Sequence, residues 1–175
     1  ARMGLPSYRR WIADATGLDL EQIRTVNVAD GEPLPATIDA DGIIGGGSGH
    51  GSYEPLPWID RTKEFFRAAQ RDGVPELHIC WSHQAKVESI GGRSQAGPAG
   101  RRFGVETIRL TPAGRRDPLF AGVPDEFEIF TSHVDVVDRS SARIGCGDAV
   151  ELAHSPVYRD EALAIGATCR TIQAH

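Results

Sequence analysis

One short stretch, residues 78–84, constrains the fold of this chain more than any other. It joins a predicted buried strand, residues 77–80, to a predicted helix, residues 84–90, which a pair of glycines closes. Cys80 stands at the junction. A strand that turns sharply into a helix at one reactive side chain is a nucleophile elbow, an arrangement typical of α/β sheets.

A cysteine at the start of a helix is a candidate nucleophile. The unpaired N–H groups and the positive end of the helix dipole favour a thiolate, so we expect a lowered pKa for Cys80. The backbone N–H of the next residue, Trp81, would point to where an oxyanion forms. The same short pattern also fits a buried structural cysteine, so the assignment needs a second residue.

That second residue lies at the far end of the chain. Residues 170–175 read as another short strand, and it ends in His175. A catalytic cysteine needs a base within hydrogen-bond reach, which the end of a neighbouring strand can supply in an open α/β sheet. We therefore predict that Cys80 and His175 approach each other.

The rest of the pattern alternates helices and strands in the first half and becomes rich in strands in the second. Helices are predicted at 8–15 and 59–70, and strands at 23–28, 43–44, 103–110, 126–130, 149–153 and 162–165. The 175 residues are enough for a single domain. The predicted fold is α/β: a doubly wound, mainly parallel central sheet with helices on both faces and an antiparallel strand extension.

Several motifs together resemble the class I glutamine amidotransferases, the Cys-His-Glu family that includes the glutaminase domain of GMP synthase and its stand-alone relatives. The resemblance runs from about Asp41 to His175 and keeps the family's order. The matching segments are residues 41–48, 53–59, 78–84, 91–93, 104–105, 109–111, 117–122, 133–137 and 172–175. A flavodoxin-like fold is implied.

The resemblance also assigns roles to individual residues. Cys80 and His175 would be catalytic, and Trp81 with Gly47 or Ser48 would give the N–H groups of an oxyanion hole. Gln84 would hold the amino-acid end of the substrate, and the segment containing His133 and Val134 would make backbone contacts to it. The glycine loop at 45–52 lacks the lysine of a P-loop and the spacing of a dinucleotide fingerprint, so a nucleotide site is not favoured.

The implied function is release of ammonia from the glutamine side-chain amide through a γ-glutamyl-cysteine thioester. No cofactor is implied. In the family, the ammonia usually passes to a synthase subunit or domain, so a synthase partner is expected along with glutamine or another γ-glutamyl compound.

The chain departs from the family pattern in two places. His78 and Ser82 stand where the elbow usually has glycines, and these bulkier residues are expected to alter the pocket or the elbow angle. The Pro-Glu that continues the family's closing motif does not follow His175, and the chain opens without a buried strand. We therefore expect that the first strand and a C-terminal segment are missing from this sequence.

These departures leave alternatives open. The chain could be an inactive or repurposed family member that binds a ligand or partner, or a hydrolase of another γ-glutamyl compound. A different family shares the elbow cysteine and the sheet, but it lacks the ending seen at residues 172–175.

Composition narrows the remaining classes. A net charge of -5 with only isolated arginine pairs argues against nucleic acid, and no apolar run approaches the roughly 20 residues of a membrane span. Three cysteines suit a reducing compartment, so a cytoplasmic location is expected, with Cys146 and Cys169 as structural thiols.

Four histidines lie near predicted strand ends and raise the option of a zinc site: His78, His83, His133 and His175. Their spacing matches no metal motif, so no metal is expected.

Overall fold

The computed structural model describes residues 7–140 and 149–175, so the opening residues and Cys146 lie outside the described part of the chain. The chain divides into two compact units, Ala1–Pro35 and Ala36–His175. Among the described residues, no helix is long and apolar enough to span a membrane.

The first unit contains helix α1 (Tyr8–Thr16) and two single turns of 3-10 helix, η1 (Leu20–Gln22) and η2 (Val28–Asp30). The side chain of Ser7 caps α1 at its start, and Gly17 ends the helix with φ of 72°. The strand predicted at residues 23–28 is wrong. Alternating polarity gave the segment the pattern of a strand, but no strand within residues 7–140 and 149–175 hydrogen-bonds to it.

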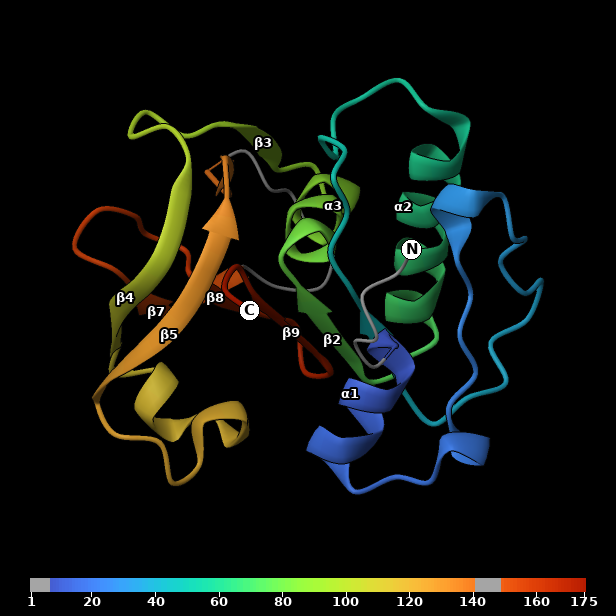
Figure 1. The fold of residues 1–175 in the computed structure, drawn as a ribbon, viewed down its shortest axis with the longest axis horizontal. Coiled ribbons are helices and arrows are strands. Elements are labelled where there is room, and N and C mark those ends of the chain that lie inside the picture. The colour runs from blue at the N-terminus through green and yellow to red at the C-terminus, as the bar shows by residue number, and fades with distance from the viewer. Residues whose placement is uncertain (1–6, 141–148) are drawn as a thin grey trace. The chain divides into compact units, whose positions relative to one another are not determined.

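The second unit is built around a seven-stranded sheet in the order β1-β2-β9-β8-β7-β4-β5 (Figure 1). Its strands are β1 (Ile43–Gly45), β2 (Glu76–Ile79), β4 (Arg102–Leu110), β5 (Glu126–His133), β7 (Ala149–His154), β8 (Ala162–Ile165) and β9 (Cys169–Ile172). The pairs β1–β2 and β2–β9 are parallel, and the other four pairs are antiparallel. The predicted α/β fold with an antiparallel extension is confirmed, but the sheet is mixed instead of mainly parallel, because only β1, β2 and β9 pair in parallel.

Smaller elements connect these strands. Strands β3 (Arg93–Ala96) and β6 (Asp135–Asp138) form a separate antiparallel pair. Two short 3-10 helices, η3 (Gly114–Arg116) and η4 (Pro118–Phe120), lie between β4 and β5.

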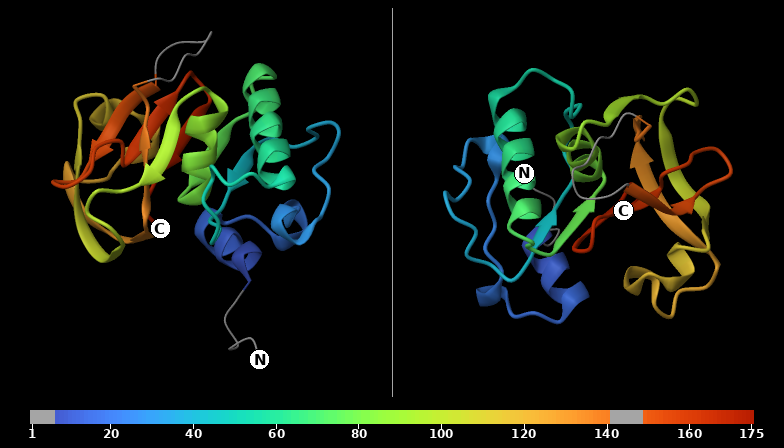
Figure 2. Two further views of the ribbon diagram at one scale, coloured as in Figure 1. Left: turned by 90° about the horizontal axis from the view of Figure 1, so that it is seen from above. Right: turned by 180° about the vertical axis from the view of Figure 1, so that it is seen from behind.

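Helices α2 (Pro57–Arg71) and α3 (Trp81–Ser89) lie side by side (Figures 1 and 2). Proline at the first position starts α2, where its missing N–H costs no hydrogen bond. Ile59 and Phe66 of α2 form one buried cluster with Trp81 and Ala85 of α3. The predicted helix at 59–70 is confirmed, and packing on α2 fixes the position of the helix that follows Cys80.

Strand β8 is buried on both faces and separates two further cores. Leu163 and Ile165 pack with Val87 of α3, whereas Ala162 and Ala164 belong to a cluster with Ile108, Leu110 and Phe120. Because successive side chains of a strand point to opposite faces, α3 covers one face and the antiparallel strands curl over the other. The sheet therefore holds β2 and β9, the two strands that lead to the site, in its interior.

Candidate active site

Cys80 has the backbone conformation of a nucleophile elbow. It lies between β2 and α3 with φ of 57° and ψ of −110°, in a region that L-residues other than glycine rarely adopt. Its N–H donates to the carbonyl of Ile172 at 2.9 Å, and its carbonyl accepts from the N–H of Gln84 at 3.3 Å. The β2–β9 ladder and the first turn of α3 therefore hold the strained residue from both sides, and the predicted strand-to-helix turn is confirmed.

The predicted direction of the Cys80 pKa is wrong. Burial raises the pKa of the thiol, the backbone N–H of Trp81 lowers it, and the charge of Asp135 raises it further. The helix N-terminus does act on the sulfur, but removal from water has the larger effect. The buried position of Cys80 therefore favours a thiol.

The side chains of His78 and Ser82 are both buried, so neither is an exposed wall of a pocket. The Ser82 hydroxyl accepts from Ile79 N–H at 2.8 Å and donates to the Ile79 carbonyl at 3.1 Å. A Cβ on Gly45 would lie 2.7 Å from both the Ser82 side chain and His78 Nδ1. Gly45 on the neighbouring strand β1 thus leaves room for the side chains of His78 and Ser82, which stand where the elbow usually has glycines.

A buried polar network lies beneath the elbow. Glu76 accepts hydrogen bonds from Lys86 Nζ at 2.7 Å and His78 Nε2 at 2.9 Å, and Lys86 also donates to the Phe66 carbonyl at 3.0 Å. Burial lowers the pKa of His78, which favours the neutral ring. Potential metal-binding atoms of Glu76, His78 and Cys169 lie within 4.8 Å of one another. The Glu76 oxygens already bind a cation and a histidine N–H, so the group fits an ion-pair network better than a metal centre.

His83 lies in the first turn of α3 and contacts β9. It is buried, and its Nδ1 lies 2.7 Å from the Thr171 hydroxyl on β9. Burial lowers its pKa to about 3, so the ring is neutral at physiological pH.

The glycine loop lies next to the elbow. The Gly46 carbonyl accepts from the N–H of Ser82 at 3.2 Å. This hydrogen bond fixes the backbone just before Gly47 and Ser48 at the start of α3. Further along, Ser52 is fully buried and donates to Glu88 Oε1 of α3 at 2.8 Å. Two contacts with one helix therefore hold both ends of the loop, and the second oxyanion donor stays a prediction.

Gln84, His133 and Asp135 form a connected group. Gln84 Nε2 donates to the Asp135 carbonyl and to Gln173 Oε1, both at 3.2 Å, and His133 Nδ1 donates to the same carbonyl at 2.9 Å. The Val134 carbonyl accepts from Gly97 N–H at 2.9 Å. The structure thus brings the predicted substrate-binding segment onto the turn of α3 that follows Cys80.

His175 lies beyond the end of β9, which stops at Ile172 instead of continuing to the histidine. Its N–H donates to the Phe130 carbonyl of β5 at 2.9 Å. Since β2 and β9 are adjacent parallel strands, Cys80 and His175 follow strand ends at the same edge of the sheet. The hydrogen bond between their side chains stays a prediction.

Sequence reasoning missed the carboxylate of Asp135, whose charge adds to the effect of burial in raising the pKa of the Cys80 thiol. Its Oδ1 accepts a long hydrogen bond, 3.4 Å, from the hydroxyl of Tyr53 in the loop before α2. The only signal in the sequence was its place directly after Val134, which does not distinguish a solvated aspartate from one beside a cysteine.

No protein-family model matches the chain, but individual proteins are similar to it in sequence. One subunit of the glutamine-hydrolysing GMP synthase of Halobacterium salinarum is 29% identical over 65% of this chain and 55% of its own length. The glutamine amidotransferase-like protein chyE of Penicillium rubens is 34% identical over 44% of this chain and 33% of its own. The chain thus spans between a third and just over half of these relatives.

Solved structures share the fold. A glutamine amidotransferase from Thermotoga maritima matches with a TM-score of 0.77 and 19% identity, over 95% of this chain and 68% of that protein. One from Methylobacillus flagellatus matches with a TM-score of 0.78 and 21% identity, over 98% of this chain and 65% of that protein. The chain is thus similar in sequence to a GMP synthase subunit and to an amidotransferase-like protein, and similar in fold to solved glutamine amidotransferases.

Proposed function

We propose that this domain releases ammonia from the side-chain amide of glutamine, with Cys80 as the nucleophile. The conformation of Cys80 carries the proposal, because a strained cysteine between a buried strand and a helix is the arrangement that covalent acyl transfer needs. The names of the relatives, which include a glutamine-hydrolysing GMP synthase, support the substrate class.

In the first half-reaction, His175 takes the proton of the Cys80 thiol, and the thiolate attacks the amide carbon and forms a carbon–sulfur bond. The N–H groups of Trp81 and of Gly47 or Ser48 stabilise the tetrahedral oxyanion. The carbon–nitrogen bond then breaks, and His175 gives its proton to the departing ammonia. In the second, water that has lost a proton to His175 attacks the thioester, the carbon–sulfur bond breaks, and His175 returns the proton to the sulfur as glutamate leaves.

The ammonia would serve an acceptor on another domain or subunit. The relative from Halobacterium salinarum is named as one subunit of a synthase, which supports delivery of ammonia to a partner. Gln84, His133 and Val134 are proposed to hold the amino-acid end of glutamine.

Ammonia release by the full-length protein tests the nucleophile. Cys80→Ala is expected to lower the rate at least ~100-fold, because it removes the bond-forming atom. Cys169→Ala is the matched control: this second thiol is buried in the core and burial raises its pKa to about 12, so its loss should leave the rate unchanged. Undiminished release by Cys80→Ala would contradict the proposal.

A covalent readout complements the kinetics. An electrophilic analogue of glutamine should add once to the parent protein and to Cys169→Ala, and not to Cys80→Ala, as measured by intact mass. Labelling of Cys80→Ala to the same extent would place the reactive group elsewhere.

A further inference from the structure

Glu88, in the last turn of α3, has a carboxylate that three different segments of the chain bind. Its side chain is only 11% exposed. Lys63 of α2 pairs with Oε2 at 2.5 Å, and the hydroxyls of Ser52 and Ser94 both donate to Oε1. The two hydroxyls also lie 2.5 Å from each other. This carboxylate therefore joins the glycine loop, β3 and α2 to the helix that begins after Cys80.

Glu88 is too far from the nucleophile to take part in the chemistry itself. It comes eight residues after Cys80, which corresponds to about 12 Å along an α-helix. Any effect of Glu88 on the reaction must therefore act through a segment that it binds. The glycine loop is such a segment, because it ends at Ser52 and its beginning contacts the elbow, where the Gly46 carbonyl accepts from Ser82 N–H.

The path of this loop beside α3 depends on its two ends (Figure 1). The six residue steps from Gly46 to Ser52 could span about 20 Å if they were fully extended. Their partners on the helix, Ser82 and Glu88, are only about 9 Å apart along its axis. The chain between the ends is therefore slack, and three of its five residues are glycines, which restrict the backbone little. Without the bond to Glu88, the loop could follow other paths past the elbow.

We propose that Glu88 is a positioning residue for the oxyanion hole. Through Ser52, it holds the glycine loop where the N–H of Gly47 or Ser48 can face the carbonyl oxygen of the substrate. This inference rests on the proposed function. Donors stabilise an oxyanion only when they are arranged in advance, and a shift of about 1 Å that originates far from the chemistry can lower the rate about 100-fold. Lys63 holds the carboxylate from the other side.

The first test is a split between kcat and KM for ammonia release by the full-length protein. The oxyanion exists only after Cys80 has attacked, so a displaced donor should lower kcat and leave KM unchanged. Glu88→Ala should lower kcat for L-glutamine about 10- to 100-fold and change KM less than about twofold. Ser52→Ala should lower kcat by a smaller factor, about 3- to 10-fold, because the carboxylate stays in place.

Ser89→Ala is the matched control for Ser52→Ala. The Ser89 hydroxyl is also buried and lies in the same turn of α3 as Glu88. It donates to the Lys86 carbonyl of its own helix at 2.7 Å and does not contact the loop. Its removal should therefore leave both kcat and KM unchanged.

A reaction that forms no oxyanion separates positioning from general damage to the site. Iodoacetamide alkylates a cysteine thiolate: a carbon–sulfur bond forms and iodide leaves. The rate of this alkylation, measured at Cys80 by peptide mass spectrometry, should equal that of the parent in Glu88→Ala and in Ser52→Ala. Equal losses in alkylation and in ammonia release would overturn the positioning role.

A neutral pair checks whether the hydrogen bond to Ser52 carries the effect. In the double variant Lys63→Met, Glu88→Gln, the amide oxygen can still accept from Ser52, and methionine fills the space of the lysine stem. Its kcat should return to within about threefold of the parent. A double variant as slow as Glu88→Ala would overturn the role of that hydrogen bond. If Glu88→Ala fails to fold, Ser52→Ala and the double variant carry the test.

The outcomes separate this inference from the proposed function. A parent protein that releases ammonia, with kcat unchanged in Glu88→Ala and in Ser52→Ala, would overturn the role of Glu88 alone. A parent protein that releases no ammonia from L-glutamine would overturn the proposed function and this inference with it.

Discussion

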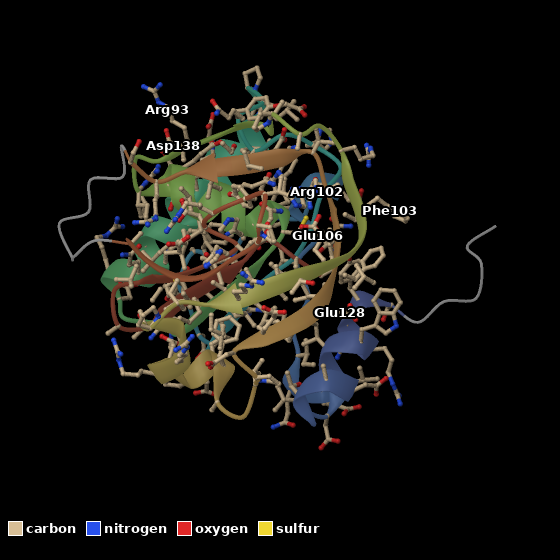
Figure 3. All side chains as sticks on the ribbon, turned by 90° about the vertical axis from the view of Figure 1, so that its left-hand side faces the viewer. Arg93, Arg102, Phe103, Glu106, Glu128 and Asp138 are labelled. Atoms are coloured by element: carbon tan, nitrogen blue, oxygen red, sulfur yellow. The ribbon has the colours of Figure 1, made fainter. Side chains whose placement is uncertain are left out.

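The elbow region consists of β2, β9 and α3, and its two strands belong to the same sheet as the β4–β5 pair. The elbow region buries charged side chains, whereas the β4–β5 pair exposes apolar ones. In the elbow region, Glu76 and Lys86 are buried and bonded to each other. In the β4–β5 pair, Phe103 is 74% exposed, and it projects outward from β4 beside Phe130 (Figure 3). Positions in the first region are therefore specified by hydrogen bonds and steric fit, whereas the outer face of the second tolerates change.

The largest effect is expected from Glu76→Gln. The substitution leaves the Lys86 ammonium buried without its anion, and breaking a buried pair typically costs about 3 to 5 kcal/mol in the free energy of unfolding. The exposed Glu128 of β5 gives the control, since Glu128→Gln should stay within about 0.5 kcal/mol. Urea denaturation measures both. Equal, small losses would mean that the two regions do not differ in this way.

A pH-dependent effect is expected at Glu161, where the two regions meet. Its carbonyl accepts from Gln173 N–H at 2.8 Å, while its side chain lies within electrostatic reach of Glu106 and Arg102 on β4. Burial raises the pKa of Glu161 from 4.5 to about 7. Between these values the folded state binds more protons than the unfolded state, so the free energy of unfolding should fall as pH rises.

The predicted fall is about 3 kcal/mol from pH 4.5 to 7, at roughly 1.4 kcal/mol per pKa unit. Glu161→Gln should flatten this part of the profile, as denaturant titrations at several pH values would reveal. A parent protein and variant with parallel profiles would show that Glu161 titrates normally.

Steric fit under the elbow is tested by Gly45→Ala. The new Cβ would lie 2.7 Å from the Ser82 side chain, and overpacking of this kind costs about 1 to 3 kcal/mol. Adding Ser82→Gly should restore part of the loss, because it removes the atoms that clash. Thermal melts of the two single variants and the double variant measure the coupling, and simple additivity would argue against the predicted contact.

The smallest effect is expected from Phe103→Ser. Phe103 contacts Phe130 edge-to-face, with ring centroids 5.3 Å apart, but it is mostly exposed. An aromatic pair contributes about 0.5 to 1.5 kcal/mol, so we expect a loss near the lower limit. A loss as large as that of Glu76→Gln would remove the contrast between the two regions.

The structural elements that could be predicted from the sequence are those that depend on local pattern. The elbow at Cys80, the helix that became α2 and the strands that became β4, β5, β7 and β8 were all recognisable from periodicity and turn residues. The segment 23–28 had the right alternation but no partner strand, which a single sequence does not reveal. Long-range pairing therefore explains why this predicted strand did not form.

The polar core and the thiol pKa were beyond sequence reasoning. Lys86 has the appearance of a surface residue on a polar helix, yet it is fully buried, because Glu76 lies on the adjacent strand and supplies its anion. The helix-dipole argument for Cys80 was sound but incomplete, since burial and the charge of Asp135 depend on residues far away in the sequence.

The burial of Lys86 also determines how the protein responds to amine-reactive reagents. The chain has only two lysines, and the other, Lys63, pairs with Glu88 at 2.5 Å while its side chain remains 15% exposed. Acylation of Lys86 requires the amine to leave Glu76 and the Phe66 carbonyl, so α2 and β2 must separate first. The rate at which Lys86 is modified thus reports how often α2 and β2 separate from each other.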